Sequence, residues 1–122
     1  MKVAFFEIEE WEKEIIRSKL PYDIFFFEEK IDPENLPPEA DFDVVSIFID
    51  SKIDKAVLNY LPSLKFIATR STGYDHIDVS SCNEKGVKVS FVPGYGDNTV
   101  AEYTFGLILN LTRKIYKAIN QI

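Results

Sequence analysis

Residues 64–78 read LKFIATRSTGYDHID, an apolar run that leads into a glycine turn and ends on an acidic residue. The run Leu64–Ala68 predicts a buried strand, and Asp78 suits the N-cap of a helix that follows it. Gly73, at the centre of the turn, allows the backbone to approach a ligand closely. Ligands of open α/β sheets bind in the crevice at the carboxyl ends of the strands, so this loop is a candidate anion site.

The alternation of apolar run and helical period extends from this stretch towards both ends of the chain. We expect strands at residues 2–8, 22–27, 44–49, 64–68 and 87–92, with helical periods at 9–20, 53–61 and 78–85. Residues 28–43 contain three prolines and read as a loop that could hold one turn of helix. Parallel strands need crossover connections, so the pattern predicts a doubly wound α/β sheet with helices on both faces. We predict the flavodoxin-like strand order 2-1-3-4-5.

The last part of the chain is typical of one long helix. Residues 99–102 fit a capping box, and Phe105, Leu109 and Ile115 are among the apolar residues that follow it. The pattern reaches Ile122 without a glycine cap or a proline, which indicates a piece of a longer protein. An exposed apolar helix tends to find a partner, so we expect a homo-oligomer formed through this C-terminal helix.

Composition and charge exclude several functional classes. The chain has 122 residues, a net charge of -6 and interspersed basic and acidic residues, so there is no basic patch for nucleic acid. No stretch resembles a signal peptide or a membrane span. The single cysteine, Cys82, suits a reducing compartment, and we expect a cytoplasmic protein in which this thiol is structural, not reactive.

Two further patterns could carry chemistry. Gly94 and Gly96 lie between a strand and a helix, but the dinucleotide fingerprint would need a third glycine where Thr99 stands. His76 is either a general base beside Asp75 or, as we favour, a residue of a surface turn. No second histidine or cysteine stands at ligand spacing, so the sequence predicts no metal site.

Four segments together resemble the D-isomer-specific 2-hydroxyacid dehydrogenases, and the D-lactate dehydrogenase branch in particular. These segments are RSTGYDHID at 70–78, GVKV at 86–89, VPGY at 92–95 and VAEYTFGLI at 100–108. The resemblance implies a flavodoxin-like substrate (catalytic) domain at residues 1–98. Residues 99–122 would be a long helix that leads to a cofactor domain absent from this chain.

The resemblance also implies roles for individual residues. The backbone at Thr72 and Gly73 would bind the carboxylate of a small 2-oxo or 2-hydroxy acid, and Tyr95 would line the substrate pocket. Gly96 and Val100 would lie near the nicotinamide of NAD. The catalytic Arg, Glu and His and the Rossmann motif are expected beyond the last residue, so no catalytic residue is assigned here and the chain alone should be inactive.

Two alternatives and one departure from the family pattern remain open. The chain could be a free-standing flavodoxin-like binding or regulatory module, or a small nucleotide-binding protein that uses residues 94–99. Asp50 stands near a position where the lactate-specific branch often has an aromatic residue, which leaves the substrate undefined.

Overall fold

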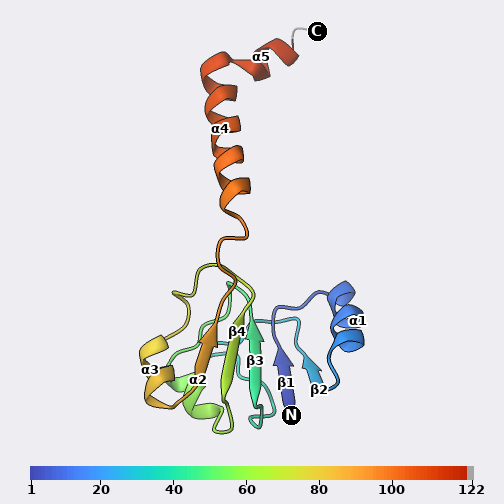
Figure 1. Cartoon of the computed structure of the whole chain (residues 1–122), viewed down its shortest axis with the longest axis vertical. Coiled ribbons are helices and arrows are strands. Elements are labelled where there is room, and N and C mark those ends of the chain that lie inside the picture. Colours follow the sequence, from blue (N-terminus) through green and yellow to red (C-terminus); the bar gives the residue numbers. More distant parts are fainter. Residues whose placement is uncertain (121–122) are drawn as a thin grey trace.

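A computed structural model describes residues 1–120 as an α/β domain from which a long helix projects (Figure 1). In chain order the elements are β1 (Lys2–Phe5), α1 (Glu10–Lys19), β2 (Asp23–Phe26), β3 (Val44–Ile47), α2 (Lys55–Tyr60), β4 (Phe66–Thr69), α3 (Val79–Glu84), β5 (Lys88–Ser90), α4 (Asp97–Arg113) and α5 (Ile115–Ile119). No helix among these residues is long and apolar enough to cross a membrane.

The five strands form one parallel sheet in the order β2-β1-β3-β4-β5, which confirms the flavodoxin-like order. Sequential pairing would place β2 beside β3, but β1 lies between them, so the order reverses at the β1–β3 pair. All carboxyl ends therefore meet at one edge, and α4 rises from that edge (Figure 1). The candidate loop 70–78 follows β4 at the same edge.

The sheet is covered by helices on both faces, because alternate residues of each strand point to opposite sides. Val3 and Phe5 face α1, where they pack with Ile16 and Leu20. Trp11 and the other apolar residue on the outer side of α1, Ile15, are exposed. The opposite face carries the larger core, to which Ala4, Phe6, Val45, Ile47 and Ile67 contribute with Val57 and Leu58 of α2.

The connection from β2 to β3 contains no helix, which confirms the loop predicted at residues 28–43. The place of a helix in the core is taken by two side chains of the loop itself. Ile31 and Phe42 are both fully buried, and the Phe42 ring packs edge-on against Phe25 at 5.3 Å and Phe27 at 6.2 Å. This proline-containing loop thus supplies part of the hydrophobic core.

The long helix also differs from its prediction at both ends. It begins at Asp97 after Gly96, without a side-chain cap, so the predicted capping box at residues 99–102 is wrong and Thr99 lies within the first turn. It ends at Arg113, and the next residue, Lys114, adopts a left-handed φ of 53° and separates α4 from α5. No residue of either helix is buried, and the predicted apolar side chains of Phe105, Leu109 and Ile115 are exposed.

Candidate functional site

The turn after β4 is fixed from behind by a chain of three polar side chains. The buried Ser71 hydroxyl donates to the carbonyl oxygen of Gly73 (2.7 Å) and lies 2.6 Å from Thr69 Oγ1, which lies 3.2 Å from His76 Nε2. Each hydroxyl has one proton. Ser71 uses its own on Gly73, so Thr69 donates to Ser71, and His76 Nε2 carries the proton donated to Thr69. His76 therefore supports the turn from a half-buried position, and a role as general base finds no support.

The tip of the turn leaves two adjacent backbone donors free. Thr72 Oγ1 donates to the Val92 carbonyl oxygen (2.9 Å), and Val92 N–H donates to the Ser71 carbonyl oxygen (3.0 Å), which ties the turn to the end of β5. Within residues 1–120, the N–H groups of Thr72 and Gly73 donate to no protein acceptor. Both residues are exposed, so these groups can bind an anion from solution.

All five residues that the sequence assigned to the site line one hollow of about 560 Å³. The turn after β4 contributes Thr72 and Gly73, and the junction between β5 and α4 contributes Tyr95, Gly96 and Val100. A Cβ added at Gly96 would meet no atom within 4 Å, so the wall is open at that point. No histidine or arginine is among the lining residues in the described part of the chain.

Four further residues line this hollow and were not assigned to the site from the sequence: Ile49, Ser71, Asp97 and Thr99. Only Ile49 lies outside the two loops that the sequence singled out. Ile49, at the carboxyl end of β3, lines the hollow beside Thr72 and Gly73 and is 57% exposed. Asp50, the residue that departs from the family pattern, instead lines two other hollows, one beside Glu7 and one beside His76. The rule that ligands bind beyond the strand ends could have singled out Ile49, because it follows the neighbouring strand.

Arg70, the first residue of the turn, joins three strand ends. Its guanidinium donates to the carbonyl oxygens of Phe6 (3.0 Å) and Glu7 (2.6 Å) and to Ser46 Oγ (3.2 Å), and lies 5.8 Å from the Phe48 ring centre. Burial lowers the pKa of Arg70 from its usual value, against the opposing effect of nearby carboxylates. All of its side-chain hydrogen bonds stay within the sheet edge, so it has a structural role.

The far end of the turn is held by Asp78, as predicted. Its carboxylate accepts from Ser81 N–H (3.0 Å) and Ser81 Oγ (2.7 Å) at the start of α3, and these hydrogen bonds lower its pKa. Gly86 ends α3 with a left-handed φ of 73°.

Cys82 is fully buried in α3, and this burial raises the pKa of its thiol, with a smaller effect of Asp78. A raised pKa fits an inert thiol. No cluster of three potential metal ligands lies within the described residues.

Known proteins with similar sequences show to which family the chain with this strand-end hollow belongs. The family model for the "D-isomer specific 2-hydroxyacid dehydrogenase, catalytic domain" matches residues 3–122. The chain belongs to this family. The resemblance carried by the four motifs is therefore confirmed, and the parallel α/β sheet is that of a D-2-hydroxyacid dehydrogenase domain.

Three relatives illustrate how much of such a protein the domain represents. It is 31% identical to a 2-hydroxyacid dehydrogenase homolog of Haemophilus influenzae and 27% identical to D-lactate dehydrogenase of Escherichia coli. Each alignment covers 97% of this chain and 37% of the relative. The solved D-lactate dehydrogenase of Aquifex aeolicus, complexed with NAD and lactic acid, matches with a TM-score of 0.77 and 28% identity over 98% of this chain and 37% of that one. The D-2-hydroxyacid dehydrogenase domain thus spans under two fifths of these relatives.

Proposed function

We propose that the chain is the substrate-binding part of an NAD-dependent D-2-hydroxyacid dehydrogenase of the D-lactate type. The observation that carries this proposal is the pair of free N–H groups at Thr72 and Gly73 in the hollow beyond the strand ends. Two neighbouring backbone donors suit a carboxylate, and hydrogen bonds to an ionised acceptor are stronger than those between neutral groups. The substrate class is therefore a small 2-oxo or 2-hydroxy acid.

The opposite wall of the hollow fits the other components of such a site. Tyr95 is exposed beside Thr72 and Gly73 and would contact the substrate. Gly96 leaves room at the start of α4, and we place the nicotinamide there, beside Gly96 and Val100. NAD would supply the hydride acceptor in the complete enzyme.

The domain boundary that we propose divides residues 1–98 from residues 99–122. We also propose a location in the cytoplasm, because a single cysteine suits a reducing compartment.

We expect the chain to bind a 2-oxo acid weakly and to turn over none. Titration of pyruvate into the ¹⁵N-labelled chain should shift the amide signals of Thr72 and Gly73, with a dissociation constant on the order of millimolar. Hydroxyacetone, which lacks the carboxylate, is the control and should leave both signals in place. Shifts that are equal for the two compounds, or oxidation of NADH by the pure chain with pyruvate, would contradict the proposal.

The alternative is a free-standing flavodoxin-like binding or regulatory module. The coding sequence that follows Ile122 separates the two proposals. A strand with a glycine fingerprint soon after Ile122 supports the dehydrogenase, and a native stop codon supports the module. A nucleotide-binding protein that uses residues 94–99 would instead show an increase in melting temperature with NAD.

We also propose that α4 makes the chain self-associate, because its apolar residues include Phe105 and Leu109 one turn apart and both are exposed. Sedimentation should show dimers or larger species at tens of micromolar, and Leu109→Lys should weaken association about tenfold. Thr104→Lys adds the same charge away from the face formed by Phe105 and Leu109, and serves as the control. A monomer at that concentration, or equal effects of the two variants, would contradict this proposal.

A further inference from the structure

Glu7 occupies an unusual position just beyond β1. Its φ of 53° is left-handed, a conformation that favours glycine. Its backbone is held on both sides, because its N–H donates to the Glu29 carbonyl oxygen (3.1 Å) and its own carbonyl oxygen accepts from Arg70 (2.6 Å). A non-glycine residue in this conformation persists only where its surroundings fix it. In this conformation the side chain of Glu7 reaches the backbone that follows β3.

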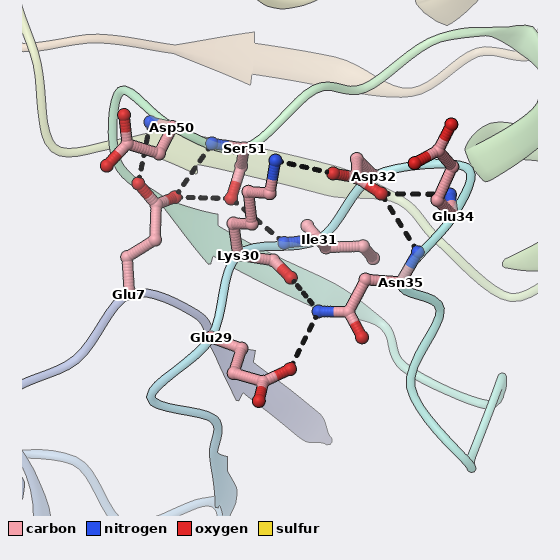
Figure 2. A network of polar contacts seen from close by, with 9 residues as sticks. All are labelled: Glu7, Glu29, Lys30, Ile31, Asp32, Glu34, Asn35, Asp50 and Ser51. Carbon is pink, nitrogen blue, oxygen red and sulfur yellow. Dashed lines mark hydrogen bonds and ion pairs between the residues drawn. The ribbon is translucent and has the colours of Figure 1, made fainter.

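The Glu7 carboxylate is received by three backbone N–H groups that follow β3. One oxygen accepts from Asp50 N–H (2.7 Å), and the other accepts from Phe48 N–H (2.8 Å) and Ser51 N–H (3.2 Å). The Ser51 hydroxyl makes a fourth hydrogen bond to the carboxylate. Figure 2 shows the carboxylate facing Asp50 and Ser51. Convergent N–H groups of this kind form a nest for an anion.

The nest lies where α/β sheets of this order bind ligands. It is formed at the carboxyl end of β3, and Glu7 follows β1, so it stands at the β1–β3 pair where the strand order reverses. The adjacent hollow is lined mainly by carboxylates, those of Glu9, Glu10, Glu28 and Asp50, with Lys30 as the cation. A free anion must overcome the repulsion of these carboxylates, so it binds there only at a high concentration. A carboxylate attached to the chain overcomes it through a high local concentration.

The nest flanks one residue in the wall of the substrate hollow. Its donors at Phe48, Asp50 and Ser51 flank Ile49, the residue that lines the hollow beside Thr72 and Gly73. The buried Ser51 hydroxyl also accepts from the N–H of Ile31 (3.1 Å), which ties the nest to the β2–β3 loop (Figure 2). Loss of the carboxylate would remove the hydrogen bonds that hold the backbone on both sides of Ile49, at Phe48 and at Asp50 and Ser51.

We infer that Glu7 is a positioning residue, a built-in anion that fills the carboxylate nest after β3 and holds Ile49 against the hollow. When its side chain is removed, the nest binds a small free monocarboxylate such as formate. Only the meaning of Ile49 for the substrate depends on the proposed function. The nest and its ligand class rest on the hydrogen bonds of Glu7 alone.

Formate rescue of Glu7→Ala tests the inference without any substrate. The variant should melt about 10 °C below the wild type. Sodium formate should raise its melting temperature about 5 °C more than sodium chloride at equal ionic strength. Val57→Ala, which loses buried volume in α2, is the matched control because it is destabilised with the nest intact. In the control and in the wild type, sodium formate and sodium chloride should change the melting temperature by equal amounts. An equal response of Glu7→Ala to formate and chloride would overturn the inference.

Amide hydrogen exchange provides a second readout and covers the case in which Glu7→Ala does not fold. Glu7→Gln retains the size of the side chain but has only one acceptor oxygen, and its amide N–H₂ opposes the donors of the nest. The amides of Phe48, Asp50 and Ser51 should exchange at least about tenfold faster in this variant. Formate should not slow them, because the glutamine still fills the nest. Unchanged exchange at all three amides would overturn the inference.

The outcomes separate this inference from the proposed function. Formate could also bind at Thr72 and Gly73, but Val57→Ala and the wild type retain those groups, so a difference between Glu7→Ala and both of them reports on the nest. Rescue without a response of Thr72 and Gly73 to pyruvate would support the positioning role and contradict the dehydrogenase proposal. A pyruvate response without rescue would do the reverse.

Discussion

Arg70→Ala should lower the free energy of unfolding by about 3 kcal/mol, measured by urea denaturation at neutral pH. The guanidinium supplies hydrogen bonds to the carbonyl oxygens of Phe6 and Glu7 and to the buried Ser46 hydroxyl. Hydrogen bonds from a charged donor contribute more than those between neutral groups, and their loss leaves strand-end acceptors without a partner. No other side chain in the described structure donates to these two carbonyl oxygens.

Two control variants separate this effect from a general loss of positive charge. Arg70→Lys keeps the charge but replaces a planar fork by a point donor, so its loss should lie between zero and that of Arg70→Ala. Arg17→Ala removes an exposed arginine whose guanidinium lies 5.0 Å from the Phe26 ring centre, and should cost about 0.5–1 kcal/mol. Equal losses for Arg17→Ala and Arg70→Ala would show that the three-strand junction contributes no stability of its own.

The junction marks the limit of what the sequence could predict. Arg70 was recognised as part of a family motif, but its two carbonyl acceptors are 63 and 64 positions away in the sequence, and no local pattern connects them. Glu7 is similar, because its donors at residues 48–51 belong to another strand end. Apolar period and turn chemistry did predict the strands and the cap at Asp78, since these depend on neighbouring residues. The strand order depends on pairing between distant segments, so it was chosen as the order of a known fold and not read from local pattern.

The errors in the predicted fold have local physical causes. The capping box at residues 99–102 was a chemically reasonable pattern, but the turn through Gly94, with its left-handed φ of 65°, allows the helix to begin at Asp97. Thr72 and Gly73 of the hollow lie in the loop that the strand-end rule singled out, whereas Tyr95, Gly96 and Val100 were assigned only through the family resemblance. Ile49 was overlooked because an apolar residue at the end of an apolar run reads as part of the strand.

Phe42→Ala should be the most destabilising single change, with a loss of about 4 kcal/mol in urea denaturation. The ring is fully buried and lies within 6.2 Å of the ring centres of Phe25 and Phe27, so its removal leaves a cavity between the loop and β2. The composition of residues 28–43, which are acidic and contain three prolines, does not indicate this burial. Large apolar residues inside such a segment are easily read as incidental.

Leu36→Ala and Phe42→Leu decide what the β2–β3 loop does. Leu36 is 36% exposed in the same loop and should cost about 1 kcal/mol or less, whereas Phe42→Leu keeps most of the buried volume and should cost about 1.5 kcal/mol. Similar small losses for Phe42→Ala and Leu36→Ala would mean that the loop only connects two strands. A much larger loss for Phe42→Ala than for Leu36→Ala would mean that the β2–β3 loop covers the sheet in the way that a crossover helix normally does. Ile31, buried in the same loop and bonded through its N–H to Ser51, then places one end of the loop directly against the Glu7 nest.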